Sequence, residues 1–330
     1  MNTKRTFATV ILAAMASCAM AHCAHASNAD VNAPENHEYQ EEIAKSNRAI
    51  LANPEDAKAY AHRGWALEQL GQYRKEIDDF NIAIKLDPKN ARDFLHRGWA
   101  FGQLGQYEKE LDDCTKATVL DPKDAAAWLI RGSAYGELGQ YEKELDDCNT
   151  SIGLDPKYEQ AYCNRAWDFE KLGQYQRGID DYTQAININP KNSVAFCNRG
   201  WAHGKLGHLQ KGINDCSAAI SLNPNYAWAY KHRGWMYGSL GQFQKEIDDS
   251  TIAINLDAKI ADAYRHRGFA KAKLGNFESA IDDYWKAIFS DPADMNAYDL
   301  LLRAQLGQFE QVFVNGTKDI NHFLNQVIGQ

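Results

Sequence analysis

A strict period of 34 residues runs through most of this sequence. The pair Leu-Gly recurs at this spacing from Leu70-Gly71 to Leu274-Gly275. Arginine recurs in step with it, at Arg63, Arg97, Arg131, Arg165, Arg199, Arg233 and Arg267. A period of this length, kept without insertion or loss, indicates an array in which each unit packs on its neighbours. The length of 330 residues therefore does not predict several separate globular cores.

Each unit is predicted to form two helices. We number Ala57–Asn90 as positions 1 to 34 of the first unit. Positions 1–14 show helical periodicity, and the glycine at position 15 supplies a left-handed cap that ends the first helix. Positions 17–30 form a second helix, which ends before Asp-Pro or Asn-Pro in most units because proline cannot continue a helix. One hairpin cannot bury its apolar face alone, so neighbouring hairpins must stack.

The residue pattern of the unit resembles the tetratricopeptide repeat (TPR) family. Position 4 is aromatic, position 8 is glycine except at Ala166, positions 14 and 15 are Leu-Gly, and position 32 is proline except at Ala258. The Arg-Gly pair is similar to the RG-containing repeats of bacterial arrays. The resemblance covers about 57–294 and implies an all-α fold, an α-solenoid of stacked antiparallel helix hairpins wound into a right-handed superhelix. It also implies a concave groove that binds other proteins.

The regions that flank the array are predicted to be a signal peptide and two caps. Residues 27–56 form an N-terminal half-repeat cap, because Tyr39–Pro54 fits positions 17 to 32 of a unit that lacks its first helix. Residues 57–294 hold the seven units. The register breaks after 294, so 295–330 are interpreted as a degenerate capping hairpin.

The first 26 residues have the pattern of a cleaved signal peptide. Lys4 and Arg5 precede an apolar stretch that is too short to span a membrane, and Ala24-His25-Ala26 is a small-x-small cleavage site. The mature chain is expected in the periplasm or outside the cell. One alternative is a lipid anchor at Cys18, since Met15–Cys18 loosely resembles a lipobox. The other is a cytosolic protein with an apolar tail. No membrane span is expected elsewhere.

The remaining composition indicates a soluble protein without nucleic-acid affinity. The formal charge is −8, whereas binding to phosphates requires clustered lysine and arginine. Cleavage after Ala26 leaves five cysteines, which are Cys114, Cys148, Cys163, Cys197 and Cys216. An odd number without close spacing predicts core packing rather than a disulfide framework or a metal site.

The recurring tetrapeptide HRGW is predicted to divide between two faces of the first helix. At 100° per residue, positions 4, 7, 8, 11 and 14 share the face that packs on the second helix. The arginine at position 7 therefore points inward and requires a partner, because an unpaired buried charge is unfavourable. Position 23 is aspartate in all seven units, so we predict a repeated Arg–Asp pair. The alternative is that both side chains reach solvent separately.

The other half of the tetrapeptide, at positions 6 and 9, is predicted to line the groove. Position 9 supplies Trp65, Trp99, Trp167, Trp201, Trp235 and Phe269. Position 6 supplies His62, His96, Asn164, Asn198, His232 and His266. A row of exposed aromatics flanked by histidine and asparagine suits an extended peptide or helix. The alternative is that the tryptophans only pack between neighbouring helices. Lys231 and Arg265 at position 5 predict a basic end of the groove for an acidic segment.

No catalytic, cofactor or metal motif is found in the sequence. It contains no glycine-rich phosphate loop, G-x-S-x-G elbow, CxxC or HExxH. The histidines lie one unit apart, without the spacing that places two ligands on one helix. We therefore expect an exported, non-enzymatic scaffold that binds another protein or peptide. The alternatives are a structural accessory subunit of an envelope-assembly or enzyme complex, and a secreted host-interaction protein.

Overall fold

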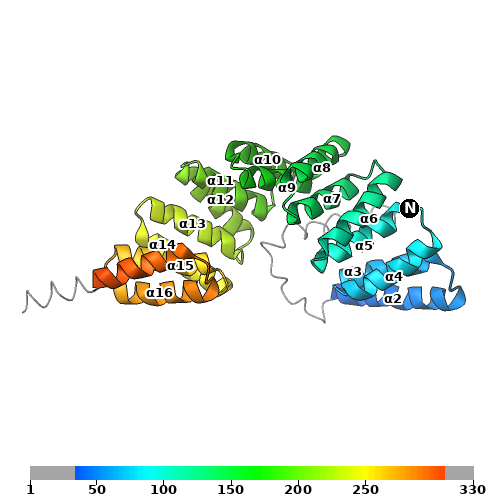
Figure 1. Cartoon of the computed structure of the whole chain (residues 1–330), viewed down its shortest axis with the longest axis horizontal. Helices are drawn as coiled ribbons and strands as arrows, with labels where there is room; N and C mark the ends of the chain where they lie inside the picture. Colours follow the sequence, from blue (N-terminus) through cyan, green and yellow to red (C-terminus); the bar gives the residue numbers. More distant parts are fainter. Residues whose placement is uncertain (1–33, 309–330) are drawn as a thin grey trace, which may run out of the picture. The chain divides into compact units, whose positions relative to one another are not determined.

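The computed structural model describes residues 34–308, and all regular elements in that range are helices. The described part of the chain forms two compact bodies, 34–189 and 190–308. The hairpins are α3 (Ala57–Gln69) with α4 (Tyr73–Leu86), α5 (Ala91–Gln103) with α6 (Tyr107–Leu120), α7 (Ala125–Glu137) with α8 (Tyr141–Leu154), α9 (Glu159–Lys171) with α10 (Tyr175–Ile188), α11 (Ser193–Lys205) with α12 (Leu209–Leu222), α13 (Ala227–Ser239) with α14 (Phe243–Leu256), and α15 (Ala261–Lys273) with α16 (Phe277–Ser290). These pairs are shown in Figure 1. The predicted solenoid of helix hairpins is confirmed.

The turn inside each hairpin is made by the glycine at position 15. All seven glycines have a positive φ, from 67° at Gly71 to 80° at Gly275. In the first unit the backbone N–H of Gln72 donates to the carbonyl of Leu67 over 2.9 Å. This is the closure of a Schellman cap, which satisfies a carbonyl at the helix end. The predicted cap is therefore confirmed.

First helices of consecutive units contact one another within each body. In the first body this holds along α3, α5, α7 and α9, and in the second along α11, α13 and α15. Within each body, the second helix of a unit also packs on the first helix of the next unit, as α4 does on α5 and α12 on α13. First helices therefore form the inner layer of the stack, and positions 2, 5, 6, 9 and 13 belong to that layer.

The predicted Arg–Asp pair is present in every unit. In the second unit, Arg97 Nε and Nη2 donate to the two carboxylate oxygens of Asp113 over 2.7 and 2.8 Å. Arg97 Nη1 also donates to Asn81 of the preceding unit over 2.7 Å. The arginine thus joins both helices of its own hairpin to the neighbouring hairpin. The same pairs are Arg63–Asp79, Arg131–Asp147, Arg165–Asp181, Arg199–Asp215, Arg233–Asp249 and Arg267–Asp283.

Glycine at position 8 allows close packing against position 24, a contact that the sequence pattern did not identify. A Cβ on Gly98 would lie 2.9 Å from Cys114 Sγ, and one on Gly64 would lie 2.9 Å from the ring of Phe80. All five cysteines in the described part of the chain are buried. Three of them occupy position 24, where Phe80, Tyr182 and Tyr284 are buried in other units, so this site accepts side chains of different size.

Three of the four glutamates at position 20 lie over a second glycine at position 12, whereas Glu76 lies beside Glu68. Glu110 is 1% exposed, and a Cβ on Gly102 would overlap its carboxyl group. Gly136 and Gly238 hold Glu144 and Glu246 in the same way. The glycine provides the volume that the longer side chain needs, so the two positions are matched.

Replacing Gly102 with alanine is expected to destabilise the protein by about 2 kcal/mol, because overpacking forces the buried Glu110 carboxyl to move. The matched control is Gly153→Ala, at a helical glycine with no atom near the added Cβ. That change is expected to stabilise the protein by roughly 0.5 kcal/mol through helix propensity. Urea denaturation of both variants measures the difference, and two shifts of the same sign would contradict this packing.

Both ends of the array differ in detail from the expected caps. Helix α2 (Pro34–Ala52) begins earlier than the predicted start at Tyr39, with a proline in the first position, where its missing N–H is tolerated. A helix also spans 295–308. There Leu301 is 5% exposed and occupies position 7, where the other units have arginine. Because leucine is uncharged, this position needs no aspartate partner. The predicted signal peptide and the second part of the C-terminal hairpin lie outside the described residues.

Candidate functional site

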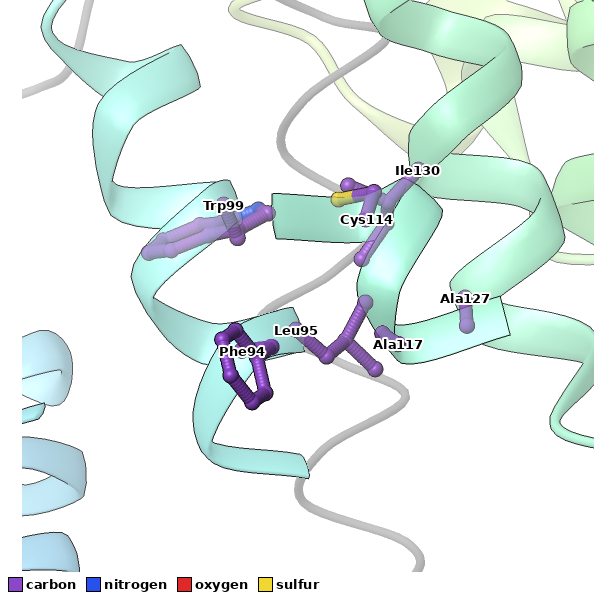
Figure 2. Packing of buried hydrophobic residues seen from close by; sticks show 7 residues of the cluster. All are labelled: Phe94, Leu95, Trp99, Cys114, Ala117, Ala127 and Ile130. Carbon is purple, nitrogen blue, oxygen red and sulfur yellow. The ribbon is translucent and has the colours of Figure 1, made fainter. Parts of the chain in front are cut away.

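Several aromatic side chains at position 9 pack against the preceding unit instead of forming an open row. The ring centroids of Trp99 and Tyr73 lie 5.5 Å apart in an edge-on contact, and Trp65 meets Tyr39 at 5.7 Å. Trp99 is only 4% exposed and belongs to a core cluster of α5, α6 and α7 (Figure 2). The expectation that Trp99 lines an open groove is therefore wrong. The expectation was wrong because a helical wheel of one helix does not show which positions the neighbouring unit buries.

Position 9 also contacts position 6 of the following unit, and the two residues are matched. Trp99 packs in the same cluster as Ile130. Ser133, which interrupts the tryptophan row, accepts a hydrogen bond from Asn164 Nδ2 over 2.9 Å. In the second body, Trp201 lies 4.5 Å from the ring of His232. The variation at these positions thus includes a packing component between units, in addition to any role in recognition.

The predicted polar groove residues are also buried in part. His96 is 8% exposed, stacks on Phe80, and its Nδ1 lies 2.7 Å from Glu68 Oε2. His232 is 7% exposed, and burial, followed by the charge of Lys231, holds its pKa well below the usual value. The expectation of open groove positions is wrong for His96, Asn164, Lys231 and His232, which are all buried. His62 stays exposed, and Trp65, Trp167, Trp201 and Asn198 are partly buried.

The predicted basic end of the groove is neutralised within the chain. Lys231 is 4% exposed, and its Nζ lies 3.3 Å from Asp262 Oδ2 and 4.1 Å from the ring centroid of Trp228. Arg265 pairs with Asp262 and, over 2.8 Å, with Asp294. Lys231 and Arg265 already have acidic partners within the chain, so the structure does not support a binding site for an acidic segment here.

An accessible part of the inner layer remains in the second body, as a hollow of about 620 Å³. Trp235 of α13 and Phe269 of α15, both half-buried, form its aromatic walls. Exposed polar side chains of Ser239, Asn296 and Asp299 lie around it. Its volume falls in the range of ligand-binding clefts, and apolar walls with a few polar groups are typical of such sites.

Two largely buried groups that line the hollow favour their uncharged forms. His266 and Glu246 both line it, and the His266 Nδ1 lies 3.8 Å from Glu246 Oε1. Burial, followed by the charge of Arg265, lowers the pKa of His266 to about 3. Burial raises the pKa of Glu246 to about 8. Burial thus favours a neutral imidazole beside a protonated carboxyl over a salt bridge. This pair adds no charge to the hollow, whose charged lining residues are Arg265 and Asp299.

The structure brings together four of the predicted groove residues in this hollow, namely Trp235, Arg265, His266 and Phe269. It adds Asn296, Asp299 and Leu300, which sequence reasoning assigned only to a cap. Extending the unit numbering beyond 294 places these three at positions 2, 5 and 6 of an eighth unit. These positions belong to the inner layer, so the repeat numbering, extended by one unit, could have predicted these three residues.

An all-α stack of matched helix hairpins defines this molecule as a helical-repeat solenoid. Models described as tetratricopeptide repeat match residues 57–90, 125–158, 159–192 and 181–214. A model of the protein prenyltransferase alpha subunit repeat matches 39–70, a range that includes most of α2 and all of α3. The chain belongs to the tetratricopeptide repeat family. A comparison with curated proteins finds no match.

Solved structures confirm the fold at low sequence identity. They include the APC/C hetero-tetramer Cut9-Hcn1, at 16% identity over 81% of this chain and 52% of that one, with a TM-score of 0.66. A tetratricopeptide repeat protein from Parabacteroides merdae has 21% identity over 82% and 99%, and a TM-score of 0.58. The type IV pilus biogenesis factor PilW has 17% over 64% and 98%, also with 0.58. This chain spans about half the length of the first. Among the described helices, none is long and apolar enough to cross a bilayer.

Proposed function

We propose that this protein is a non-catalytic scaffold that holds a segment of another protein in the hollow of its second body. The tetratricopeptide repeat fold suggests a protein–protein interaction scaffold. The observation that carries the finer proposal is the pair of half-buried aromatics, Trp235 and Phe269, beside the neutral His266 and Glu246. Aromatic anchors supply much of the binding energy of peptide sites, and two neutral groups beside them require no charged partner.

The test is site-specific photo-crosslinking in the native host. A photoreactive residue at Ser239, which is exposed beside the hollow, is expected to capture a defined segment of a partner. The same residue at Ser221 of α12 is the control, because it is exposed but lies outside the hollow. Equal capture of the same proteins at both positions would contradict the proposal.

Removal of one aromatic wall tests the same site by affinity. Phe269→Ala is expected to weaken binding of the captured segment at least tenfold, as for a residue at an interface hot spot. Phe289→Ala is the matched control, since Phe289 is 90% exposed on α16 and lies outside the hollow. A Phe269→Ala variant that melts as a folded protein and binds like wild type would overturn the assignment. Loss of folding alone would favour a structural role.

We further propose that the scaffold is exported. The support is the basic and apolar pattern of the first 26 residues, followed by Ala24-His25-Ala26. Mass spectrometry of the protein from its host is expected to find an N-terminus at Ser27. A lipid-modified N-terminus at Cys18 would indicate the lipoprotein alternative, and an intact leader would contradict export.

A further inference from the structure

A buried cluster of three metal-ligating groups lies between the third and fourth units. Glu144 and Cys148 belong to α8, and Asp168 belongs to α9. The Cys148 sulfur and one oxygen of each carboxyl group all lie within 4.8 Å of one another. The three residues are 5%, 0% and 0% exposed, respectively. Two adjacent turns of one helix and the facing helix thus present a sulfur and two oxygens to one point.

Asp168 is the residue that makes this cluster unusual. It occupies position 10, which in the other six units is Ala66, Ala100, Ala134, Ala202, Met236 and Ala270. A carboxyl group in place of a buried methyl group is strongly unfavourable without a partner. Apart from the neighbouring Glu144 carboxyl group, neither oxygen of Asp168 has a hydrogen-bond partner in the described part of the chain.

A shared proton does not fully satisfy this arrangement. A proton on Glu144 can donate to one oxygen of Asp168, which leaves the second oxygen without a donor. A cation would satisfy both carboxyl groups and the thiol at once.

We propose that Glu144, Cys148 and Asp168 bind Zn²⁺ as a structural ion between the third and fourth units. A thiolate with two carboxylates suits zinc better than Mg²⁺ or Ca²⁺, which prefer oxygen ligands alone. On binding, the Cys148 thiol and any protonated carboxyl group release their protons to solvent, and the ion takes up the sulfur and oxygen lone pairs. A water molecule can complete four-coordination. The sequence predicted only core packing for Cys148.

The neighbouring units provide an internal control. Glu110 and Cys114 of α6 stand at the same positions as Glu144 and Cys148, but Ala134 stands where Asp168 would be. These units therefore present two of the three ligands. The proposal assigns zinc to the complete set, so Cys114 should not contribute to binding.

The test uses the full chain with Cys18→Ser and Cys23→Ser, so that these two thiols outside the described residues do not contribute. Co²⁺ is expected to bind once per chain, with a near-ultraviolet thiolate-to-cobalt absorption band. Zn²⁺ is expected to displace it and to raise the Tm by ligand linkage. Asp168→Ala should remove the zinc-dependent rise in Tm and weaken Co²⁺ binding by about 100-fold or more, since even outer-shell changes weaken metal binding by 10–100-fold.

Asp168→Ala is expected to fold, because alanine is the residue of five other units at this position. Cys114→Ser is the matched control and should keep both the absorption band and the zinc response. A wild-type chain without a thiolate-to-cobalt band or a zinc-dependent Tm would overturn the proposal. The same holds if Asp168→Ala retains both signals, or if Cys114→Ser loses them.

Discussion

Raising the pH from 5 to 8 is expected to lower the free energy of unfolding of this protein. Glu76, Glu110 and Glu246 are at most 1% exposed, and burial raises their pKa values to about 10, 9 and 8, respectively. The ordinary pKa of glutamate is about 4.3, so the folded state retains protons that the unfolded state loses. The stability that these groups contribute is complete below about pH 4 and is lost as the pH rises toward their folded values.

The expected fall in the free energy of unfolding between pH 5 and pH 8 is large. Each group can contribute up to about 1.4 kcal/mol per pH unit between the two pKa values. Urea denaturation at pH 5, 6, 7 and 8 measures the slope. Glu110→Gln should reduce it, because glutamine carries no titratable proton at the same site. Glu108→Gln is the matched control, since Glu108 is exposed on the same helix. An unchanged slope in Glu110→Gln would show that the pKa of this carboxyl group is the same in the folded and the unfolded state.

Replacing Arg97 with alanine is expected to destabilise the protein by about 3 kcal/mol or more and to lower its Tm. The change leaves Asp113 buried, with a side chain that is 4% exposed, and without its bidentate partner. Removal of one member of a buried pair is strongly unfavourable, even where the intact pair contributes little. It also removes the hydrogen bond to Asn81 that joins the second unit to the first.

The control for this prediction is Arg92→Ala, since Arg92 is exposed on the same helix. The double variant Arg97→Ala, Asp113→Ala should recover part of the lost stability, because no unpaired buried charge remains. Thermal melts monitored by circular dichroism report all three. A Tm of Arg97→Ala equal to that of wild type would mean that the pair contributes nothing to stability.

The candidate site could be predicted only in part from the sequence. Trp99 and Trp235 occupy the same position of the unit and the same face of an isolated helix. Trp99 is buried against Tyr73 of the preceding unit, whereas Leu209 stands at the corresponding place before Trp235. Trp235 contacts Trp201 and remains half-buried beside the hollow. Exposure therefore depends on the neighbouring unit, which a helical wheel does not include.

Sequence alone determined the features that each unit needs for itself. The period predicted the hairpins, Gly71 and its equivalents predicted the turns, and the recurrence of arginine with aspartate predicted the pair. These features depend on local backbone geometry and on contacts inside one hairpin, and the residues responsible for both recur in every repeat. Only the tertiary structure showed which inner-layer positions are exposed. It also showed that Lys231 pairs with Asp262, and that Asp168 lies beside Glu144 and Cys148. Those outcomes depend on contacts between units, because burial and charge at one position are set by side chains 20 or more residues away.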